Sequence, residues 1–223
     1  MGRQVDVALF DWSGTLVDDL LVVWEATYRT LMSFGLPYLG LEEFRERFFL
    51  PWYEFYGRFG LRSEEALREV DSRFYRTYVP LSLKIRPFPQ TESVLRSLKD
   101  LGFKTAIVTQ TKKALLLGQI ARFGFENLVD ATVAAEDASE LKPSPKPVLV
   151  ALEKLGAKPA RSMLTGDMAE DIIAARKAGV KAISIIWKGS YHTEPKITEK
   201  APDFIAHDLY EVMRILQREN KLK

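Results

Sequence analysis

Short, nearly continuous apolar runs recur along the chain and predict the strands of a buried sheet. The first run covers residues 5–10 and ends at the polar turn Asp11-Trp12-Ser13-Gly14-Thr15. Similar runs follow at residues 104–109, 130–135, 162–166, 181–186 and 203–206. Runs of this kind are typical of strands that are covered on both faces, as in a parallel sheet.

Helical patterns lie between several of these runs. Apolar residues recur every three to four positions at residues 94–101, 148–155 and 172–175. A chain that alternates strands with helices in this way predicts an open α/β fold, with a doubly wound, mostly parallel, Rossmann-like sheet.

Residues 17–86 interrupt the alternation, because they carry no strand signal and their apolar residues follow helical spacing. Two prolines, Pro87 and Pro89, mark the return to the α/β pattern. We therefore expect a core domain of residues 1–16 and 87–223 and an α-helical cap domain of residues 17–86, with hinges at residues 17–19 and near Pro87. The cap has eight aromatic residues between Phe44 and Phe59, which predict a small helical core or, as the alternative, a wall that faces the substrate.

Composition narrows the class of ligand. The chain has 32 basic and 30 acidic residues, a balance that gives no electrostatic reason to expect a nucleic acid or an anionic membrane as a partner. It has no cysteine, so disulfides and thiolate metal sites are excluded and a reducing cytoplasm would suit the protein. Neither a signal peptide nor a membrane-spanning apolar stretch is indicated, so we expect a cytoplasmic protein. Whether the protein is a monomer or a homodimer stays open.

The polar residues 188–201 follow the strand of residues 181–186, and we interpret them as a surface loop.

Residues that follow the predicted strands carry the candidate chemistry, because ligands of open α/β sheets bind beyond the carboxyl ends of the strands. Asp11 leaves the first strand into a glycine-containing turn, where a carboxylate can attack phosphorus. Thr109 ends the second strand, where its hydroxyl and nearby backbone N–H groups could hold phosphate oxygens, although a threonine here could equally cap a helix.

Two further segments add charge of both signs. Lys142 lies in the turn Leu141-Lys142-Pro143-Ser144-Pro145 and could screen the repulsion between Asp11 and a phosphate, with Lys146 as a competitor for that role. Asp167 follows the strand of residues 162–166, and Asp171 lies one helical turn later on the same face. Together with Asp11, these carboxylates would make a hard oxygen site suited to Mg²⁺.

This ordered set of residues resembles the haloacid dehalogenase superfamily, in its phosphatase-like branch with a helical cap inserted after the first core strand. The resemblance implies that Asp11 is the nucleophile and that Asp11, the backbone carbonyl of Ser13, Asp167 and Asp171 hold or orient a magnesium ion. It also implies that Thr109 binds the phosphoryl group of a small phosphorylated metabolite and that Lys142 pairs with both Asp11 and the phosphate.

Ser13 departs from the family pattern, which has a second aspartate at this position as the general acid and base. A serine hydroxyl cannot deliver a proton as a carboxylic acid does, and general acid–base catalysis is worth roughly 10²–10⁴-fold. We therefore expect a preference for acyl or aryl phosphates, whose leaving groups need little protonation.

Two alternatives stay open at this point. Family members that cleave the carbon–phosphorus bond of phosphonoacetaldehyde resemble the chain at Asp11-Trp12, but they need a cap lysine, and residues 17–83 contain none, with Lys84 as the sole candidate. A protein that binds a phosphorylated metabolite as a sensor, with negligible turnover, is the other alternative.

Overall fold

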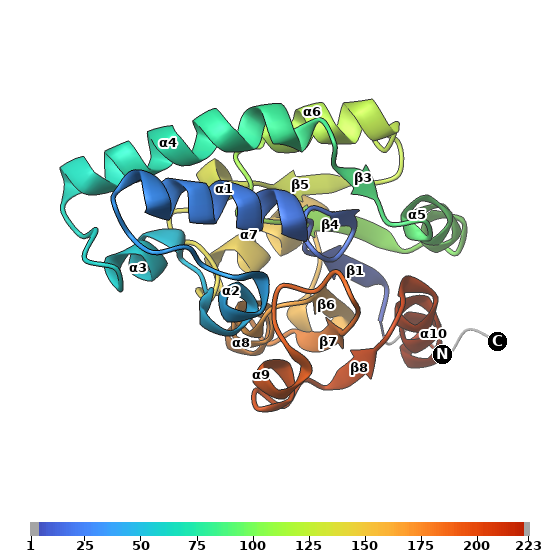
Figure 1. The fold of residues 1–223 in the computed structure, drawn as a ribbon. Helices are drawn as coiled ribbons and strands as arrows, with labels where there is room; N and C mark the ends of the chain where they lie inside the picture. The colour runs from blue at the N-terminus through green and yellow to red at the C-terminus, as the bar shows by residue number, and fades with distance from the viewer. Residues whose placement is uncertain (1–4, 221–223) are drawn as a thin grey trace.

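A parallel β-sheet forms the centre of the protein in the computed structural model, which describes residues 5–220 (Figure 1). Its six strands lie in the order β5-β4-β1-β6-β7-β8, and every neighbouring pair is parallel. Their bounds are β1 Val7–Phe10, β4 Lys104–Val108, β5 Ala131–Val133, β6 Ser162–Gly166, β7 Lys181–Ile185 and β8 Phe204–Ala206. The predicted α/β class and parallel sheet are confirmed, and the predicted strands differ from these bounds by at most a few residues at either end.

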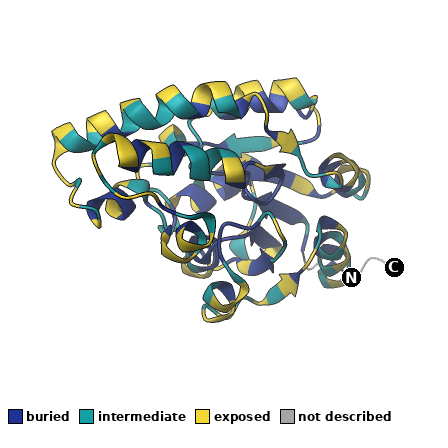
Figure 2. Cartoon of the chain, in the orientation of Figure 1, coloured by how far each residue is buried: buried dark blue, intermediate teal, exposed yellow. Residues whose placement is uncertain are grey.

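Helices cover both faces of the sheet, because successive side chains of a strand point to opposite faces. Ala8 and Phe10 of β1 pack in one cluster with α5 (Thr91–Asp100), α6 (Lys113–Phe123) and α10 (Leu209–Glu219). Val7 and Leu9 pack in the other, with α7 (Lys146–Leu155) and α8 (Ala169–Lys177). The strands are therefore buried on both sides, and the helices keep an exposed outer face (Figure 2).

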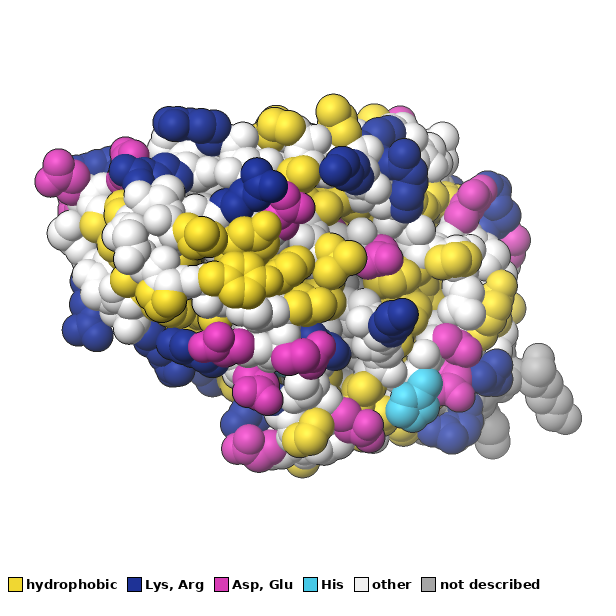
Figure 3. All heavy atoms as spheres, viewed as in Figure 1, with side chains coloured by type: hydrophobic (Ala, Val, Ile, Leu, Met, Phe, Trp, Pro, Cys, Tyr) yellow, Lys and Arg dark blue, Asp and Glu magenta, His cyan; other side chains and the backbone are white. Residues whose placement is uncertain are grey.

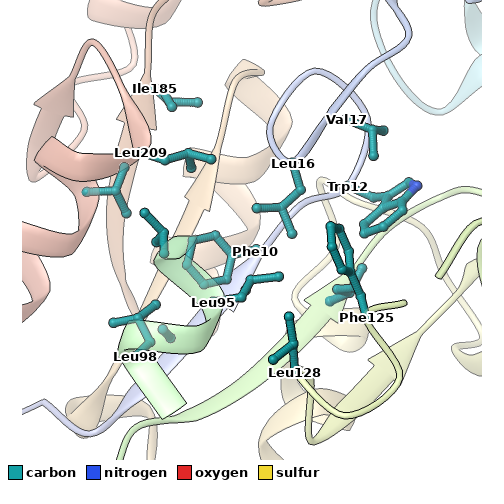
Figure 4. Packing of buried hydrophobic residues seen from close by; sticks show 14 of the residues in the cluster. Phe10, Trp12, Leu16, Val17, Leu95, Leu98, Phe125, Leu128, Ile185 and Leu209 are labelled. Carbon is teal, nitrogen blue, oxygen red and sulfur yellow. The ribbon is translucent and has the colours of Figure 1, made fainter. Parts of the chain in front are cut away.

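Trp12 belongs to the first of these clusters. Figure 4 shows its ring beside Phe125, on the side of the cluster away from Leu209, with Phe10 and Leu16 between them. Its indole Nε1 donates a hydrogen bond of 2.6 Å to the buried Gln119 Oε1. Trp12 therefore fixes the turn after β1 from the core side, while the residues on either side of it face the site.

A helical cap is inserted between β2 (Val17–Asp18) and β3 (Arg86–Pro87). Its helices are α1 Leu20–Ser33, α2 Leu41–Arg47, α3 Trp52–Gly57 and α4 Glu64–Ser82. The strands β2 and β3 pair antiparallel, with Val17 opposite Pro87 and Asp18 opposite Arg86. The helical insertion after the first core strand is thus confirmed, whereas its limits as an independent domain (residues 17–86) stay a prediction.

The cap aromatics divide between a helical core and the lining of a cavity. Phe44 and Phe55 are fully buried in a cluster with Leu31 and Val70, so they form the core of the cap. Phe48, Trp52 and Tyr56 belong to or pack on the same cluster but also line the cavity described below.

The interpretation of residues 188–201 as a surface loop is wrong in part. Ser190, Tyr191 and His192 are buried, and α9 (Glu194–Thr198) follows them. These polar residues are buried because their polar atoms have partners: His192 Nδ1 accepts a hydrogen bond of 3.1 Å from the Ala169 N–H, and Nε2 lies 3.0 Å from the Phe48 carbonyl oxygen. Burial lowers the pKa of His192 to about 3, so this histidine is neutral and ties the loop to both the cap and α8.

The surface mixes charges of both signs around a group of hydrophobic side chains over α1 and toward α2 (Figure 3). No large field of one sign is visible on this face, in keeping with the near-even charge count. Within residues 5–220, none of the helices is both long enough and apolar enough to span a membrane.

Candidate active site

The predicted site residues converge at the carboxyl ends of three neighbouring strands. Asp11 follows β1, Thr109 follows β4 on one side of it, and Asp167 follows β6 on the other. Lys142 reaches the same place from the loop before α7, and Asp171 from the first turn of α8. All five are buried. This clustering follows from the fold, because parallel strands end at one edge of the sheet.

Lys142 occupies the middle of this group. Its Nζ donates to Asp11 Oδ1 at 2.8 Å, to Asp171 Oδ1 at 2.6 Å and to the Val108 carbonyl oxygen at 2.9 Å, so each ammonium proton has an acceptor. Lys146, the competitor considered from the sequence, is half-exposed and pairs with Glu140 on the surface. Lys142 is therefore the lysine at the site.

Three carboxylates share this buried space with one ammonium group. Asp11, Asp167 and Asp171 each offer an oxygen, and these oxygens lie within 4.8 Å of one another. Burial raises the pKa of Asp11 to about 6 against the effect of Lys142, and burial together with Asp11 raises the pKa of Asp167 well above its usual range. A divalent cation would compensate this excess negative charge, and carboxylate oxygens are the ligands that hard cations prefer. The cluster could therefore hold the divalent metal.

Asp167 is also fixed by neighbours that leave its position little freedom. Its Oδ1 accepts from the Thr15 hydroxyl at 3.1 Å, and its Oδ2 accepts from the Tyr191 N–H at 2.6 Å. Gly14 permits this close approach: its φ is +72°, and an added Cβ would lie 2.4 Å from Asp167 Oδ2. Gly166 plays the same part beside Asp171, where an added Cβ would lie 2.2 Å from Cγ. Both glycines are needed for the carboxylates to lie where they do.

Thr109 lies in the turn that follows β4. Its hydroxyl is 3.1 Å from the Thr111 hydroxyl and accepts a hydrogen bond of 3.2 Å from the Thr111 N–H. The next residue, Gln110, donates from Nε2 to the Lys142 carbonyl oxygen at 2.9 Å and so links this turn to the lysine loop. Thr109 and Lys142 line one cavity together with Asp11 and Ser13.

This cavity lies between the strand ends and the cap. It encloses about 130 Å³, and its cap side is formed mainly by aromatic and aliphatic side chains. They include Phe48, Trp52, Tyr56, Val70, Phe74 and Tyr75. The arrangement therefore combines a polar floor of Asp11, Thr109 and Lys142 with an apolar roof.

Two residues of the site were missed from the sequence. Asp19 was interpreted as part of a hinge, and its place before α1 is typical of a helix N-cap, yet its side chain makes no capping bond. Its Oδ1 instead accepts from the Gly14 N–H at 3.1 Å and from the Tyr191 hydroxyl at 3.0 Å. Tyr191 lies in the loop that was thought to be exposed. The one available signal was the acidic pair Asp18-Asp19 in apolar surroundings, and it does not indicate which aspartate is buried.

Comparisons with known proteins agree with this geometry. A family profile for haloacid dehalogenase-like hydrolases matches residues 8–185. A phosphoglycolate phosphatase from Aquifex aeolicus is 30% identical over 209 residues, which cover 89% of this chain and 90% of the relative. A pyrophosphatase PpaX from Halalkalibacterium halodurans is 24% identical over 213 residues, covering 96% and 97% of the two chains.

Solved structures share the fold at lower identity. A haloacid dehalogenase-like family hydrolase from Streptococcus pneumoniae superposes with a TM-score of 0.81 at 21% identity, covering 96% of this chain and 99% of the other. A hydrolase from Pseudomonas syringae gives a TM-score of 0.82 at 19% identity, with 95% and 98% covered. The chain therefore belongs to the haloacid dehalogenase-like hydrolases, in the phosphatase branch that carries a helical cap after the first core strand.

Proposed function

We propose that this phosphatase is magnesium-dependent and transfers the phosphoryl group of a small phosphorylated metabolite to Asp11 and then to water. The observation that carries the proposal is the place of Asp11: it lines the cavity, it is held by Lys142 at 2.8 Å, and it belongs to the carboxylate cluster. The relatives named above act, by their names, on phosphoglycolate and pyrophosphate, which are small phosphorylated compounds.

The first step would use the carboxylate of Asp11 as the nucleophile. Lys142 engages Oδ1, so we assign the attack to Oδ2: the bond from this oxygen to phosphorus forms while the bond from phosphorus to the leaving oxygen breaks. Thr109 and Lys142 would stabilise the equatorial phosphoryl oxygens. Water then attacks phosphorus and the bond to Asp11 breaks, which restores the carboxylate. Phosphate leaves with both protons of the water, and one of these protons can neutralise the released leaving group in solution.

A magnesium ion would be held by Asp11, Asp167 and the backbone carbonyl of Ser13, with Asp171 beside it, and when bound it would offset negative charge on the carboxylates and the phosphoryl group. The residues fit such an ion, since three buried carboxylates face a single ammonium group. Lys142 also contributes positive charge, and its hydrogen bond to Oδ1 fixes the direction of the Asp11 carboxylate.

Magnesium dependence is tested by phosphate release from a panel of alkyl, aryl and acyl phosphates. We expect release in Mg²⁺, loss of release in excess EDTA and recovery when Mg²⁺ is added back, because the carboxylate cluster otherwise repels the anionic substrate. Unfolding temperatures measured under the same conditions serve as the control that EDTA has not unfolded the protein. Full release in EDTA would contradict the metal assignment while leaving the phosphatase intact.

Ser13 should govern which leaving groups are accepted. In the wild type we expect acetyl phosphate to be hydrolysed faster than ethyl phosphate, because an alkoxide needs a proton that a serine hydroxyl does not supply. Ser13→Asp should raise kcat/KM for ethyl phosphate, up to about 10²-fold, and change that for acetyl phosphate little. Ser13→Ala is the matched control for losing the hydroxyl. Equal rates on both substrates in the wild type would show that another group protonates the leaving oxygen.

The phosphonoacetaldehyde alternative receives no support from the position of Lys84. This lysine is exposed just after α4 and does not line the cavity, and among residues 5–220 the one lysine that lines it is Lys142. Lys142 is held by two carboxylates and lies at the phosphate end, which does not suit it to form a Schiff base with a carbonyl group.

A further inference from the structure

The part of the substrate that lies beyond the phosphoryl group must fit between the cap and the polar floor. Phe48, Trp52 and Tyr56 come from the α2–α3 region of the cap, and Phe74 and Tyr75 from α4. Leu115 of α6 adds to the apolar wall from the core side. A group bound here would exchange water for carbon atoms over most of its surface.

Charged groups of this cavity are arranged against a second anion. Among the described residues, Lys142 is the one basic side chain that lines it, and this ammonium group is already paired with Asp11 and Asp171 and is assigned to the phosphoryl group itself. The other charged residues that line it are acidic: Asp11 and Asp171 of the carboxylate cluster, and Asp71 and Glu170. A carboxylate or second phosphate of the substrate would thus lose its hydration without gaining a cation.

Cap arginines do not supply the missing charge. Arg45 donates from Nε to the Ser190 carbonyl oxygen at 3.2 Å, Arg47 pairs with Glu43 at 2.5 Å, and the Arg58 guanidinium lies over the Phe49 ring. None of the three lines the cavity, so they do not grip the substrate. Arg47 and Arg58 are exposed, and Arg45 is half-buried against the Ser190 carbonyl group.

The cavity wall is also unfavourable for a cationic group of the substrate. Asp71 already pairs with Lys112 at 2.7 Å, and Glu170 Oε1 accepts the Leu50 N–H at 3.2 Å. Glu170 Oε2 makes no hydrogen bond, but it is almost fully buried and so is shielded from a group in the cavity. An ammonium group is strongly hydrated, so moving it into a wall of mostly apolar atoms is costly without a carboxylate of its own. An uncharged group has no strong hydration to lose and needs no oppositely charged partner in the cavity.

We infer that the substrate is a monophosphate whose remaining part is small, uncharged and apolar, such as an aryl or short aliphatic group. The inference rests on the proposed function for the phosphoryl group of the substrate, and it adds the chemical class of the part beyond that group. It sets this chain apart from relatives named for phosphoglycolate and pyrophosphate, because both of those compounds carry a second anionic group. The cavity of about 130 Å³ also has to hold the phosphoryl group, so the remaining part of the substrate is at most a single ring, since a cavity of about 150 Å³ holds benzene.

A matched pair of substrates tests the inference. Phenyl phosphate and 4-carboxyphenyl phosphate differ by one carboxylate, which does not make the phenolate a poorer leaving group. We expect kcat/KM for phenyl phosphate to be higher by about tenfold or more, because the carboxylate would be buried unpaired. 4-Aminomethylphenyl phosphate, with an ammonium group, should also be slower. Preference for either charged substrate would overturn the inference.

A variant that adds a cation should change this order. Leu115→Lys places an ammonium group on the cavity wall, and we expect it to narrow the gap between the phenyl and carboxyphenyl substrates by about tenfold. Leu117→Lys is the matched control, since Leu117 is an exposed residue of the same helix that does not line the cavity. Val23→Lys, on the cap side of the cavity, replaces Leu115→Lys if that variant does not fold.

Failure of the inference and failure of the proposed function give different results. Acetyl phosphate has almost no remaining part to fit, so its Asp11-dependent hydrolysis reports the catalytic residues alone. Binding of phenylphosphonate and 4-carboxyphenylphosphonate, measured by calorimetry, reports the cavity without any turnover. Hydrolysis of acetyl phosphate with tighter binding of the carboxylated phosphonate would overturn the inference only. No hydrolysis with tighter binding of phenylphosphonate would overturn the proposed function only.

Discussion

Replacing Asp11 by asparagine should lower phosphate release from every substrate by about 10³-fold or more, because the amide cannot act as the nucleophile on phosphorus. The substitution keeps the shape of the side chain and an oxygen that can accept the Lys142 hydrogen bond, now 2.8 Å long. It also removes one charge from a buried cluster of three carboxylates. We therefore expect the loss to appear in kcat, with the folded structure retained.

Asp18→Asn is the matched control for this variant. Asp18 lies in the same turn region, is exposed on β2 and does not line the cavity, so its substitution should leave the rate near that of the wild type. Unchanged turnover in Asp11→Asn would refute the nucleophile assignment. If the wild type binds phosphate esters yet hydrolyses none of them, the protein is a sensor rather than an enzyme.

Loss of Lys142 should have the largest effect on stability. Lys142→Met removes the one ammonium group shared by Asp11 and Asp171 and leaves two buried carboxylates and the Val108 carbonyl oxygen without their donor. Breaking a buried ion pair from one side typically costs about 3–5 kcal/mol, so the free energy of unfolding in urea should fall by about that amount. The measurement is made in EDTA, so that a bound metal does not offset the loss.

Lys146→Met controls for the loss of a lysine next to this turn. Its ion pair with Glu140 is exposed, so its removal should change the urea midpoint little. In the double variant Asp11→Asn/Lys142→Met, the change in the free energy of unfolding should differ from the sum of the changes in the two single variants, because both substitutions alter the same hydrogen bond. An Lys142→Met protein as stable as the wild type would mean that the buried carboxylates are protonated or hydrated when the lysine is absent.

Much of the fold and of the site could be predicted because the relevant signals are local. The apolar runs identify the strands, and a residue directly after a parallel strand must lie at the carboxyl edge of the sheet. Asp11, Thr109 and Asp167 were found in this way, and Asp171 follows from its spacing of one helical turn from Asp167. The roles assigned to these residues stay predictions until the variants are measured.

The parts that could not be predicted depend on contacts between distant segments. Tyr191 and His192 lie in a polar stretch with no periodic pattern, and they are buried only because Asp19, Asp167 and α8 provide partners for them. Polarity indicates exposure on average, but it does not reveal a polar side chain whose hydrogen bonds are all made inside the protein. Likewise, the sequence could not divide the cap aromatics between core and cavity wall.

The pairing of β2 with β3 has a consequence for how such proteins diversify. The chain leaves the core at Val17 and returns opposite it at Pro87, so the two ends of the insertion are neighbours whatever lies between them. A segment joined at adjacent points can be lengthened, shortened or exchanged at little cost in chain entropy to the sheet. The residues at the strand ends can then stay the same while the sequence of the cap changes. New substrate specificities can arise in this way without a change in the residues that carry out phosphoryl transfer.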